Sequence, residues 1–556
     1  MNTYLKQIST SLISFKELIK QDLVYVDKTG MLLELIKGSE NAVFLSRPRR
    51  FGKSLVLKTI AEIFSGDRSL FKGLQIEKSG YDFPQHPVLR LDMSIVSSSP
   101  QKLERAILNR LKFLAEQAKL TIKLSDFENA LIQLITGLRD KYKKNVVVLI
   151  DEYDCPLSSV PPNTPLSKAF LQVLSSFYMS LKTVNELIRF AFVTGVTRYS
   201  MVGISAGLNN LYDISLVQKY AAICGFTPEE MDLYFGDRYP IVLQSIKEND
   251  YPPTVDEQAH LSTVADLKAE ILKWYDGYSW DGQTNVLNPI SILYFFKEQS
   301  FGQYWKLNSP STHFLLNMFQ DNASELTFDK LEDVPLRDIT SLIPGQITPA
   351  SLLFQTGYLT VDKINIRNKI TYYNFKVPNS ELSGEFYNGL SEALFKILVK
   401  DSDKAMKALE LKEALMKRDA ESLTNIIGAL YAELPAVLHP DKEYRRKESF
   451  YHSLFWAYSR GLLMSSMPEE QGYMGNPDLT LRLNQETYAI IEMKYERLDD
   501  KKKSDTVLNS KANEALKFIH DKNYGEQLRR QGLKVIAVGV GIYGRGEVKA
   551  IFDQDS

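Results

Sequence analysis

A short apolar run, a basic turn and an amphipathic helix follow one another early in the chain, and this order strongly limits the possible folds. Residues Asn41–Leu45 are apolar enough for a buried strand, and apolar side chains recur at helical spacing from Lys53 to Phe64. The turn between them reads Arg47-Pro48-Arg49-Arg50-Phe51-Gly52-Lys53-Ser54. A strand, a glycine-containing loop and a helix in this order predict an α/β domain in which the helix N-terminus faces an anion.

The turn ends like a G-x-x-x-x-G-K-[ST] phosphate-binding loop. In such a loop the backbone cradles the phosphates, the lysine reaches the β- and γ-phosphates, and the hydroxyl binds Mg²⁺. The first glycine of the motif is replaced by Arg47, and Gly-Lys-Ser alone is a common tripeptide, so a basic surface turn is the alternative. The predicted nucleotide-binding residues are Arg49, Arg50, Phe51, Gly52, Lys53 and Ser54.

A second apolar strand ends in two carboxylates. The run from Val146 to Ile150 is fully apolar and is followed by Asp151 and Glu152. Ligands of open α/β sheets bind at the carboxyl ends of the strands, so both acids are expected beside the phosphate loop. Asp151 would hold Mg²⁺ through water, and Glu152 would orient or activate the attacking water. Since two separate parts of one site agree, the sequence predicts a site for ATP and Mg²⁺ rather than two unrelated surface features.

A third apolar strand, Phe190–Val193, leads into a polar loop that contains Thr194 and Arg198. At this position Thr194 could contact the γ-phosphate and Arg198 could stabilise its charge. A strand-end loop without a role in nucleotide binding explains the same residues equally well.

Apolar strands alternate with helical patterns through the first part of the chain, which predicts a parallel sheet covered on both faces. From Asp213 to Asp329 the pattern changes to helices broken by aromatic turns, and from Phe354 to Phe375 to strands and turns. Besides Asn41–Leu45, the predicted strands are Pro87–Leu91, Asn145–Ile150 and Ile188–Val193, and the predicted helices are Gln101–Leu120, Phe127–Lys141 and Leu166–Val184.

The length of 556 residues exceeds what one hydrophobic core supports, so several domains are expected. We expect a P-loop domain at 1–212, a helical lid at 213–345 and a connecting β-containing segment at 346–400. A separate α/β domain is expected at 401–556, beginning with two helices in Lys404–Leu434 and continuing after Pro440 with helix, hairpin, helix and strand.

A cluster of acids marks this last domain. Alternation after Asp478 predicts a strand, and a second strand at Tyr488–Lys494 places Glu492 and Lys494 on one face. Two carboxylates can hold a hard divalent cation, and a neighbouring lysine can stabilise phosphorane-like charge. This layout suits metal-assisted phosphodiester hydrolysis, although a solvent-exposed Glu–Lys pair is the alternative. Upstream, Glu448 lies on a predicted helix and could add a further acid.

Composition sets further limits. The formal net charge is −1, so contact with nucleic acid must come from local basic segments such as Arg445–Lys447 and Lys501–Lys503, which solvation explains equally well. Two cysteines cannot build a disulfide framework, which fits a reducing cytoplasmic compartment. The N-terminus lacks the apolar core of a signal peptide, and no apolar run is long enough for a membrane span, so no membrane association is expected.

Taken together, the motifs resemble bacterial AAA-ATPase-like proteins that carry a C-terminal PD-(D/E)XK nuclease-like domain. The resemblance implies ATP binding despite Arg47, and it maps the nuclease pattern onto Asp478, Glu492 and Lys494, with Glu448 as the upstream helix acid. Where that family often has Gln-Ile, this chain has Phe518-Ile519. The segments that carry the resemblance are Tyr25–Thr29, Arg47–Ser54, Ile150–Asp154, Thr194–Arg198, Gly207–Leu211, Cys224–Thr227, Trp274–Tyr278 and Asn288-Pro289.

These features predict an ATP-regulated, Mg²⁺-dependent nuclease that cleaves DNA or RNA. In this hypothesis Glu152 serves the ATP site, and Asp478, Glu492, Lys494 and Glu448 serve the nuclease site. The alternative is a switch ATPase whose inactive nuclease-like domain only binds nucleic acid or a protein partner. A P-loop kinase acting on a small molecule also fits the first site, but it leaves the C-terminal acids unexplained. Each of these hypotheses allows an oligomer.

Overall fold

The computed structural model separates the chain into two compact units. The N-terminal unit consists of described residues up to 379, and the C-terminal unit consists of those after 379. None of the helices in the described ranges is long and apolar enough to cross a membrane. The structure describes residues 5–11, 14–123, 126–157, 160, 164–198, 205–208, 210–248, 261–305, 333–340, 348–382, 401–432, 451, 455, 458, 459, 462, 478–497, 504–544 and 546–553.

A five-stranded parallel sheet forms the centre of the N-terminal unit, with the strand order β2-β3-β4-β1-β5. The four predicted strands are confirmed to within two residues at each end, and the predicted parallel arrangement is correct. The strands are β1 (Ala42–Ser46), β2 (Val88–Asp92), β3 (Val146–Asp151), β4 (Ile188–Gly195) and β5 (Tyr212–Asp213).

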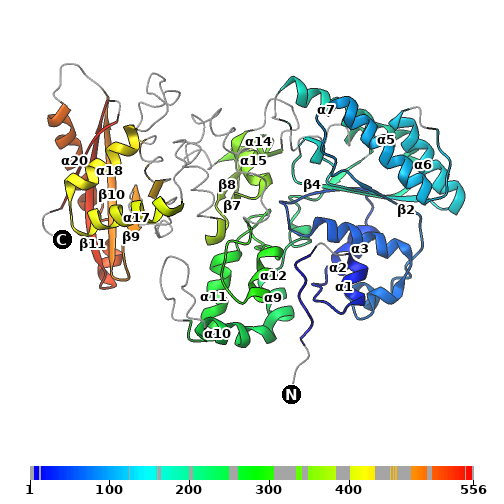
Figure 1. The fold of residues 1–556 in the computed structure, drawn as a ribbon, viewed down its shortest axis with the longest axis horizontal. Helices are drawn as coiled ribbons and strands as arrows, with labels where there is room; N and C mark the ends of the chain where they lie inside the picture. Colours follow the sequence, from blue (N-terminus) through cyan, green and yellow to red (C-terminus); the bar gives the residue numbers. More distant parts are fainter. Residues whose placement is uncertain are drawn as a thin grey trace. The chain divides into compact units, whose positions relative to one another are not determined.

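Helices cover both faces of this sheet, as the alternating pattern predicts (Figure 1). On one face lie α5 (Pro100–Gln117), α6 (Phe127–Tyr142) and α7 (Pro165–Met179), and apolar side chains on these helices and on the sheet form one buried cluster. The predicted helix Leu166–Val184 is shorter than expected, because the α-helix ends at Met179 and continues as the 3₁₀ segment η3 (Ser180–Leu187). The other face carries α1 (Phe15–Lys20), α2 (Thr29–Lys37) and α3 (Lys53–Ser65).

Four further helices share an aromatic-rich core, which confirms the helical pattern after Asp213 for the described residues. They are α9 (Pro228–Phe235), α10 (Tyr239–Glu248), α11 (Val264–Tyr275) and α12 (Pro289–Glu298). The N-terminal unit ends with α14 (Leu336–Thr340), α15 (Pro349–Thr356) and a sheet of order β6-β8-β7, made of β6 (Val334–Pro335), β7 (Thr360–Arg367) and β8 (Ile370–Lys376). The pattern from Phe354 to Phe375 predicts strands and turns, but Phe354–Thr356 is the last part of α15, whose N-cap is Thr348.

The C-terminal unit is a four-stranded mixed sheet of order β12-β11-β10-β9. The predicted two helices and the predicted hairpin are present, whereas the single strand expected at the C-terminus is a pair, β11 and β12. The elements are α17 (Asp401–Met416), α18 (Ala420–Ala432), β9 (Leu479–Arg482), β10 (Thr487–Glu496), α20 (Ser504–Asp521), α21 (Glu526–Arg530), β11 (Lys534–Tyr543) and β12 (Glu547–Phe552). The finer division of the chain at residues 212, 345 and 400 stays a prediction.

Candidate active sites

The phosphate loop links the end of β1 to the start of α3. Gly52 has φ of 97° and caps α3, and Arg50 also has a left-handed φ, of 67°. Within the described part of the chain, none of the backbone N–H groups from Arg49 to Leu55 donates a hydrogen bond to another residue. A run of N–H groups without partners at a helix N-terminus suits the oxygens of a phosphate chain, so the loop fits the nucleotide that its sequence implies.

Arg47 occupies the position of the missing first glycine, and its side chain points away from these N–H groups into the protein. Its guanidinium donates to the carbonyl oxygens of Ser46 and Ser215 at 2.9 and 2.8 Å, and lies 4.0 Å from the ring centre of Trp280. Burial lowers the pKa of Arg47 to about 10, which leaves it charged at neutral pH. Arg47, which replaces the first glycine of the motif, therefore anchors the loop and does not obstruct it. The same guanidinium also donates to the carbonyl oxygens of Tyr220 and Ala221.

Restoring the standard glycine with Arg47→Gly is expected to destabilise the protein by about 3 kcal/mol or more. The substitution leaves several buried carbonyl oxygens without a donor and removes a stacked side chain. Thermal unfolding of the full chain measures the loss. Arg49→Gly is the matched control, because Arg49 lies exposed in the same loop. Equal melting temperatures for the two variants would show that Arg47 is not an anchor.

Lys53 lies buried beneath the loop. Its Nζ donates to the carbonyl oxygens of Arg47 and Pro48 at 2.9 and 2.8 Å. Burial lowers the pKa of Lys53, while the charges of nearby carboxylates, including Asp151 and Glu152, act in the opposite direction. The ammonium group is thus bonded to the loop and close enough to the acids that end β3 for their charges to act on it.

The two acids after β3 lie beside the loop, as predicted. Burial raises the pKa of Asp151, whereas the nearby Ser54 hydroxyl lowers it, so the two predicted Mg²⁺ ligands are neighbours. Burial and the charge of Asp151 raise the pKa of Glu152, and Lys53 and then Arg49 oppose them. Glu152 has φ of 49°, a strained value for a residue with a side chain, and such strain is concentrated at functional sites.

Thr194 and Arg198 were predicted to contact the terminal phosphate, and this geometry does not support either contact. The Thr194 hydroxyl is fully buried and donates to the carbonyl oxygen of Leu45 inside the sheet, at 3.0 Å. Arg198 is also buried, and its guanidinium forms an ion pair with Asp213. Both polar groups have protein partners because the β4–β1 pairing brings the Leu45 carbonyl next to Thr194 and the end of β5 brings Asp213 next to Arg198.

The positioning role of Asp154 was not predicted from the sequence. Its carboxylate accepts hydrogen bonds from the backbone N–H of Val196 at 3.2 Å and from the N–H and hydroxyl of Thr197, both at 2.6 Å. The Tyr153 hydroxyl donates to the Thr197 carbonyl oxygen at 2.7 Å. These bonds hold the acid-bearing end of β3 against the loop that carries Arg198. Asp154 and Thr197 lie in two short motifs of the sequence, Ile150–Asp154 and Thr194–Arg198, but only the fold places these motifs side by side.

In the C-terminal unit, three predicted residues converge at one end of the β9–β10 hairpin. The Met493 N–H donates to Asp478 Oδ2 at 2.8 Å, and the Asp478 N–H donates to Glu492 Oε2 at 3.3 Å. Lys494 Nζ lies 3.0 Å from Glu492 Oε1. The Glu492 side chain is 4% exposed and that of Lys494 16%, so the alternative of a solvent-exposed Glu–Lys pair is wrong.

The helix α20 packs directly over these residues. Glu492 and Lys494 have Gly539 and Gly541 as cross-strand neighbours, and a side chain at either glycine would collide with the α20 backbone. The close approach places Phe518 beside the site, with its ring centre 4.8 Å from Lys494 Nζ. Phe518, which replaces the expected glutamine, therefore contacts the lysine through its ring and cannot donate a hydrogen bond.

The donor set of this second site suits a divalent cation. Asp478 and Glu492 supply the carboxylates, and the described residues contain no group of three or more acidic, His or Cys side chains that could complete a cation site. Water and substrate oxygens commonly fill the other positions around Mg²⁺. The predicted helix acid Glu448 lies outside the described residues, so its contribution stays a prediction.

Burial and the neighbouring Asp478 raise the pKa of Glu492 from 4.5 to about 7. Because the folded protein binds this proton more tightly than the unfolded chain does, the free energy of unfolding falls as pH rises from 4.5 to 7. The loss is about 3 kcal/mol at most. Thermal unfolding in a metal chelator should therefore show a steeper decline with pH for the wild type than for Glu492→Gln. Parallel pH profiles for the two proteins would contradict a raised pKa.

The sequence matches two known families, one over each site. The family described as "Predicted AAA-ATPase" matches residues 10–205, and the family described as "PD-(D/E)XK nuclease superfamily" matches residues 446–550. A protein of Azotobacter chroococcum mcd 1, described as "Uncharacterized protein in vnfD 5'region", is 31% identical over 525 residues. The similarity covers 93% of each chain, so it includes both units.

Proposed function

This chain belongs to the predicted AAA-ATPase family with a C-terminal PD-(D/E)XK nuclease superfamily domain, and we propose that it is an ATP-regulated, divalent-metal-dependent nuclease. One observation carries the proposal: the two units each contain an assembled group of residues suited to phosphate chemistry. Each group lies within its own compact unit, and their presence on one chain favours regulation of one reaction by the other.

In the N-terminal unit, the free N–H groups from Arg49 to Leu55 would bind the phosphates of ATP. Lys53 would exchange its carbonyl partners in the loop for phosphate oxygens. Ser54 and Asp151 would hold Mg²⁺, which neutralises charge on the phosphates when bound. Glu152, whose pKa is raised by burial and by the charge of Asp151, would orient a water molecule or accept a proton from it.

In the C-terminal unit, Asp478 and Glu492 would hold a divalent cation, which when bound polarises the scissile phosphate and lowers the pKa of water. Cation binding would favour the ionised form of Glu492, because a nearby positive charge opposes burial. Lys494 would stabilise negative charge that develops on the phosphate oxygens. The substrate class is a nucleic acid, DNA or RNA, since this reaction requires a phosphodiester.

The experiment is cleavage of labelled DNA and RNA by the full chain, with Mg²⁺ or Mn²⁺ and with or without ATP. The proposal requires metal-dependent cleavage whose rate changes when ATP is added. Cleavage at the same rate with and without ATP would contradict the proposed regulation by ATP. Nucleic-acid binding without cleavage under any condition would instead favour a switch ATPase with an inactive C-terminal unit, which the replacement of glutamine by Phe518 motivates.

A further inference from the structure

The β2 strand leaves one edge of the parallel sheet open, because it stands at the end of the strand order. The Val147 N–H donates to the Pro87 carbonyl, and the Met93 N–H donates to the Asp151 carbonyl, at 2.9 and 3.0 Å. Alternate residues of a strand face the same neighbour, so residues 87, 89, 91 and 93 face β3. Val88 and Arg90 therefore point their N–H and C=O groups outward. No other residue within the described ranges bonds to these four groups.

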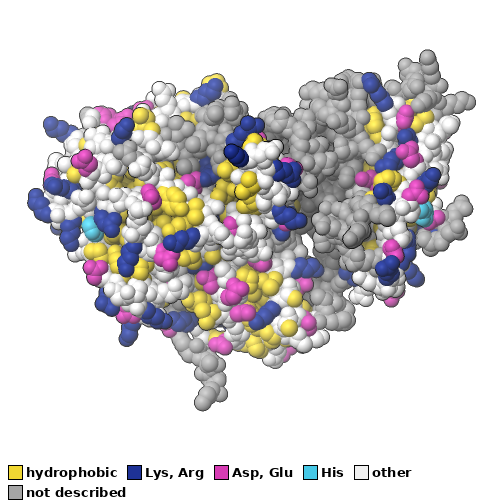
Figure 2. Space-filling model, turned by 180° about the vertical axis from the view of Figure 1, so that it is seen from behind, with side chains coloured by type: hydrophobic (Ala, Val, Ile, Leu, Met, Phe, Trp, Pro, Cys, Tyr) yellow, Lys and Arg dark blue, Asp and Glu magenta, His cyan; other side chains and the backbone are white. Residues whose placement is uncertain are grey.

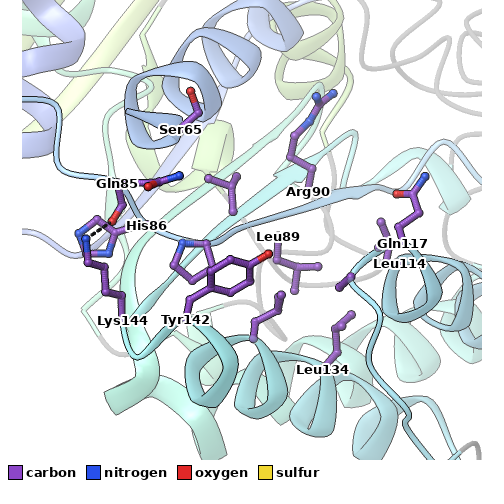
Figure 3. A pocket seen from close by; sticks show the side chains of 14 residues that line it. Ser65, Gln85, His86, Leu89, Arg90, Leu114, Gln117, Leu134, Tyr142 and Lys144 are labelled. Atoms are coloured by element: carbon purple, nitrogen blue, oxygen red, sulfur yellow. Dashed lines mark hydrogen bonds between the residues drawn. The ribbon is translucent and has the colours of Figure 1, made fainter. Parts of the chain in front are cut away.

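A groove of about 460 Å³ runs along this open edge (Figure 3). Its apolar wall comes from α5 and α6, with Leu114, Leu134 and Leu138, and Tyr142 lies on the same side of β2. Arg90 points to the opposite side of the strand, the side on which Ser65 lies at the end of α3. The groove thus offers a strand edge at its centre and an apolar surface below it, which is the arrangement that an added β-strand requires.

The described residues that line the groove include basic side chains and no acidic ones. His86, Arg90 and Lys144 line it, and none of its fourteen lining residues, all of them described, is Asp or Glu. Lys144 Nζ donates to the Gln85 carbonyl oxygen at 2.9 Å, while the Arg90 guanidinium has no ion pair or hydrogen bond with a described residue. Figure 2 shows Lys and Arg side chains gathered along the outer rim of the N-terminal unit, at the end that carries β2, α5 and α6 in Figure 1.

We propose that this groove binds an extended acidic peptide segment of a partner protein, which adds as a strand to the open edge of β2. The outward N–H and C=O groups would fix the peptide backbone, and alternate side chains would face Arg90 or the apolar wall. Nucleic acid also satisfies the charge, but it offers no row of alternating donors and acceptors to pair with a strand. The groove lies along the first half of β2, away from the end where Asp92 stands beside Asp151, so binding does not depend on the nucleotide site.

The test uses fluorescence anisotropy of short labelled peptides with the full-length protein. A peptide of alternating Glu and Val is expected to bind, and a matched peptide of alternating Lys and Val is not. Methylation of the backbone nitrogens on the pairing edge of the Glu–Val peptide should weaken binding about tenfold or more, because it removes the strand hydrogen bonds and keeps the charge. Equal binding of the methylated peptide would overturn strand addition.

Variants of the protein separate the groove from general surface charge. The double variant Arg90→Glu/Lys144→Glu should reverse the preference toward the Lys–Val peptide and leave ATP binding unchanged. The control Lys363→Glu/Lys369→Glu makes the same charge change on the exposed β7–β8 hairpin and should leave peptide binding as in the wild type. Equal effects of the two double variants would overturn the assignment. A groove variant that weakened binding of single-stranded DNA and not of the Glu–Val peptide would overturn it as well.

Discussion

Replacing Lys494 by alanine is expected to lower the rate of nucleic-acid cleavage by ~10³-fold, because a positive group aimed at developing phosphate charge contributes at about this level. The ammonium group lies 3.0 Å from Glu492 and on the side of the sheet covered by α20. The loss should appear in the single-turnover rate with saturating Mg²⁺, since nucleic-acid binding depends mainly on other basic groups.

Lys522→Ala is the matched control for this prediction. Lys522 lies over the same Phe518 ring, 5.7 Å from its centre, but it forms no contact with the acid pair. Removing it takes away one positive charge and one cation–π contact and should change the cleavage rate less than about tenfold. If both lysine variants lost activity to the same extent, Lys494 would act through general charge rather than at the reacting phosphate. If neither lost activity, the C-terminal unit would not be the nuclease.

Replacing Lys53 by alanine is expected to weaken ATP binding about 100-fold or more, which corresponds to about 2.7 kcal/mol. The ammonium is buried, which lowers its pKa, and it donates to carbonyl oxygens of the phosphate loop, while the charges of the acids after β3 act on its pKa in the opposite direction. Isothermal titration with ATP and Mg²⁺ measures the loss. ATP-dependent changes in cleavage should disappear in the same variant, while metal-dependent cleavage itself remains.

Lys58→Ala provides the control, since Lys58 lies on α3 one turn beyond the loop and is only partly buried. It should bind ATP as the wild type does. Removing Lys53 also frees the carbonyl oxygens of Arg47 and Pro48, so the melting temperature of the variant has to be recorded. A folded Lys53→Ala protein that binds ATP normally would exclude the loop as the nucleotide site.

The sequence predicts most of the sheet and both acid pairs, because these features are local. The strand that ends in Asp151 and Glu152 is contiguous, and the hairpin that places Asp478 near Glu492 spans a short turn. Alternating strand and helix patterns also predict the parallel sheet, since a parallel pair requires a crossover connection.

What the sequence could not predict depends on contacts between distant segments. The Thr194 hydroxyl donates to the Leu45 carbonyl oxygen, and Arg198 forms an ion pair with Asp213. Both contacts depend on which strands lie side by side, and no short sequence motif specifies that. The contact of Phe518 with Lys494 depends on the glycines of β11, which let α20 approach closely. The open edge of β2 likewise follows from the strand order, which local patterns leave undetermined.

Most of the residues that anchor Arg47 are synthesised long after Arg47 itself. The loop that would bind ATP leaves the ribosome well before Ser215, Tyr220 and Trp280, which hold its first residue in place. A nascent chain that ends near residue 205 contains four of the five strands of the central sheet, β1 to β4, but lacks these partners. The nucleotide site therefore reaches its final shape only after the helical segment beyond the sheet has been made, so a prematurely terminated chain is not expected to bind ATP as the complete one would.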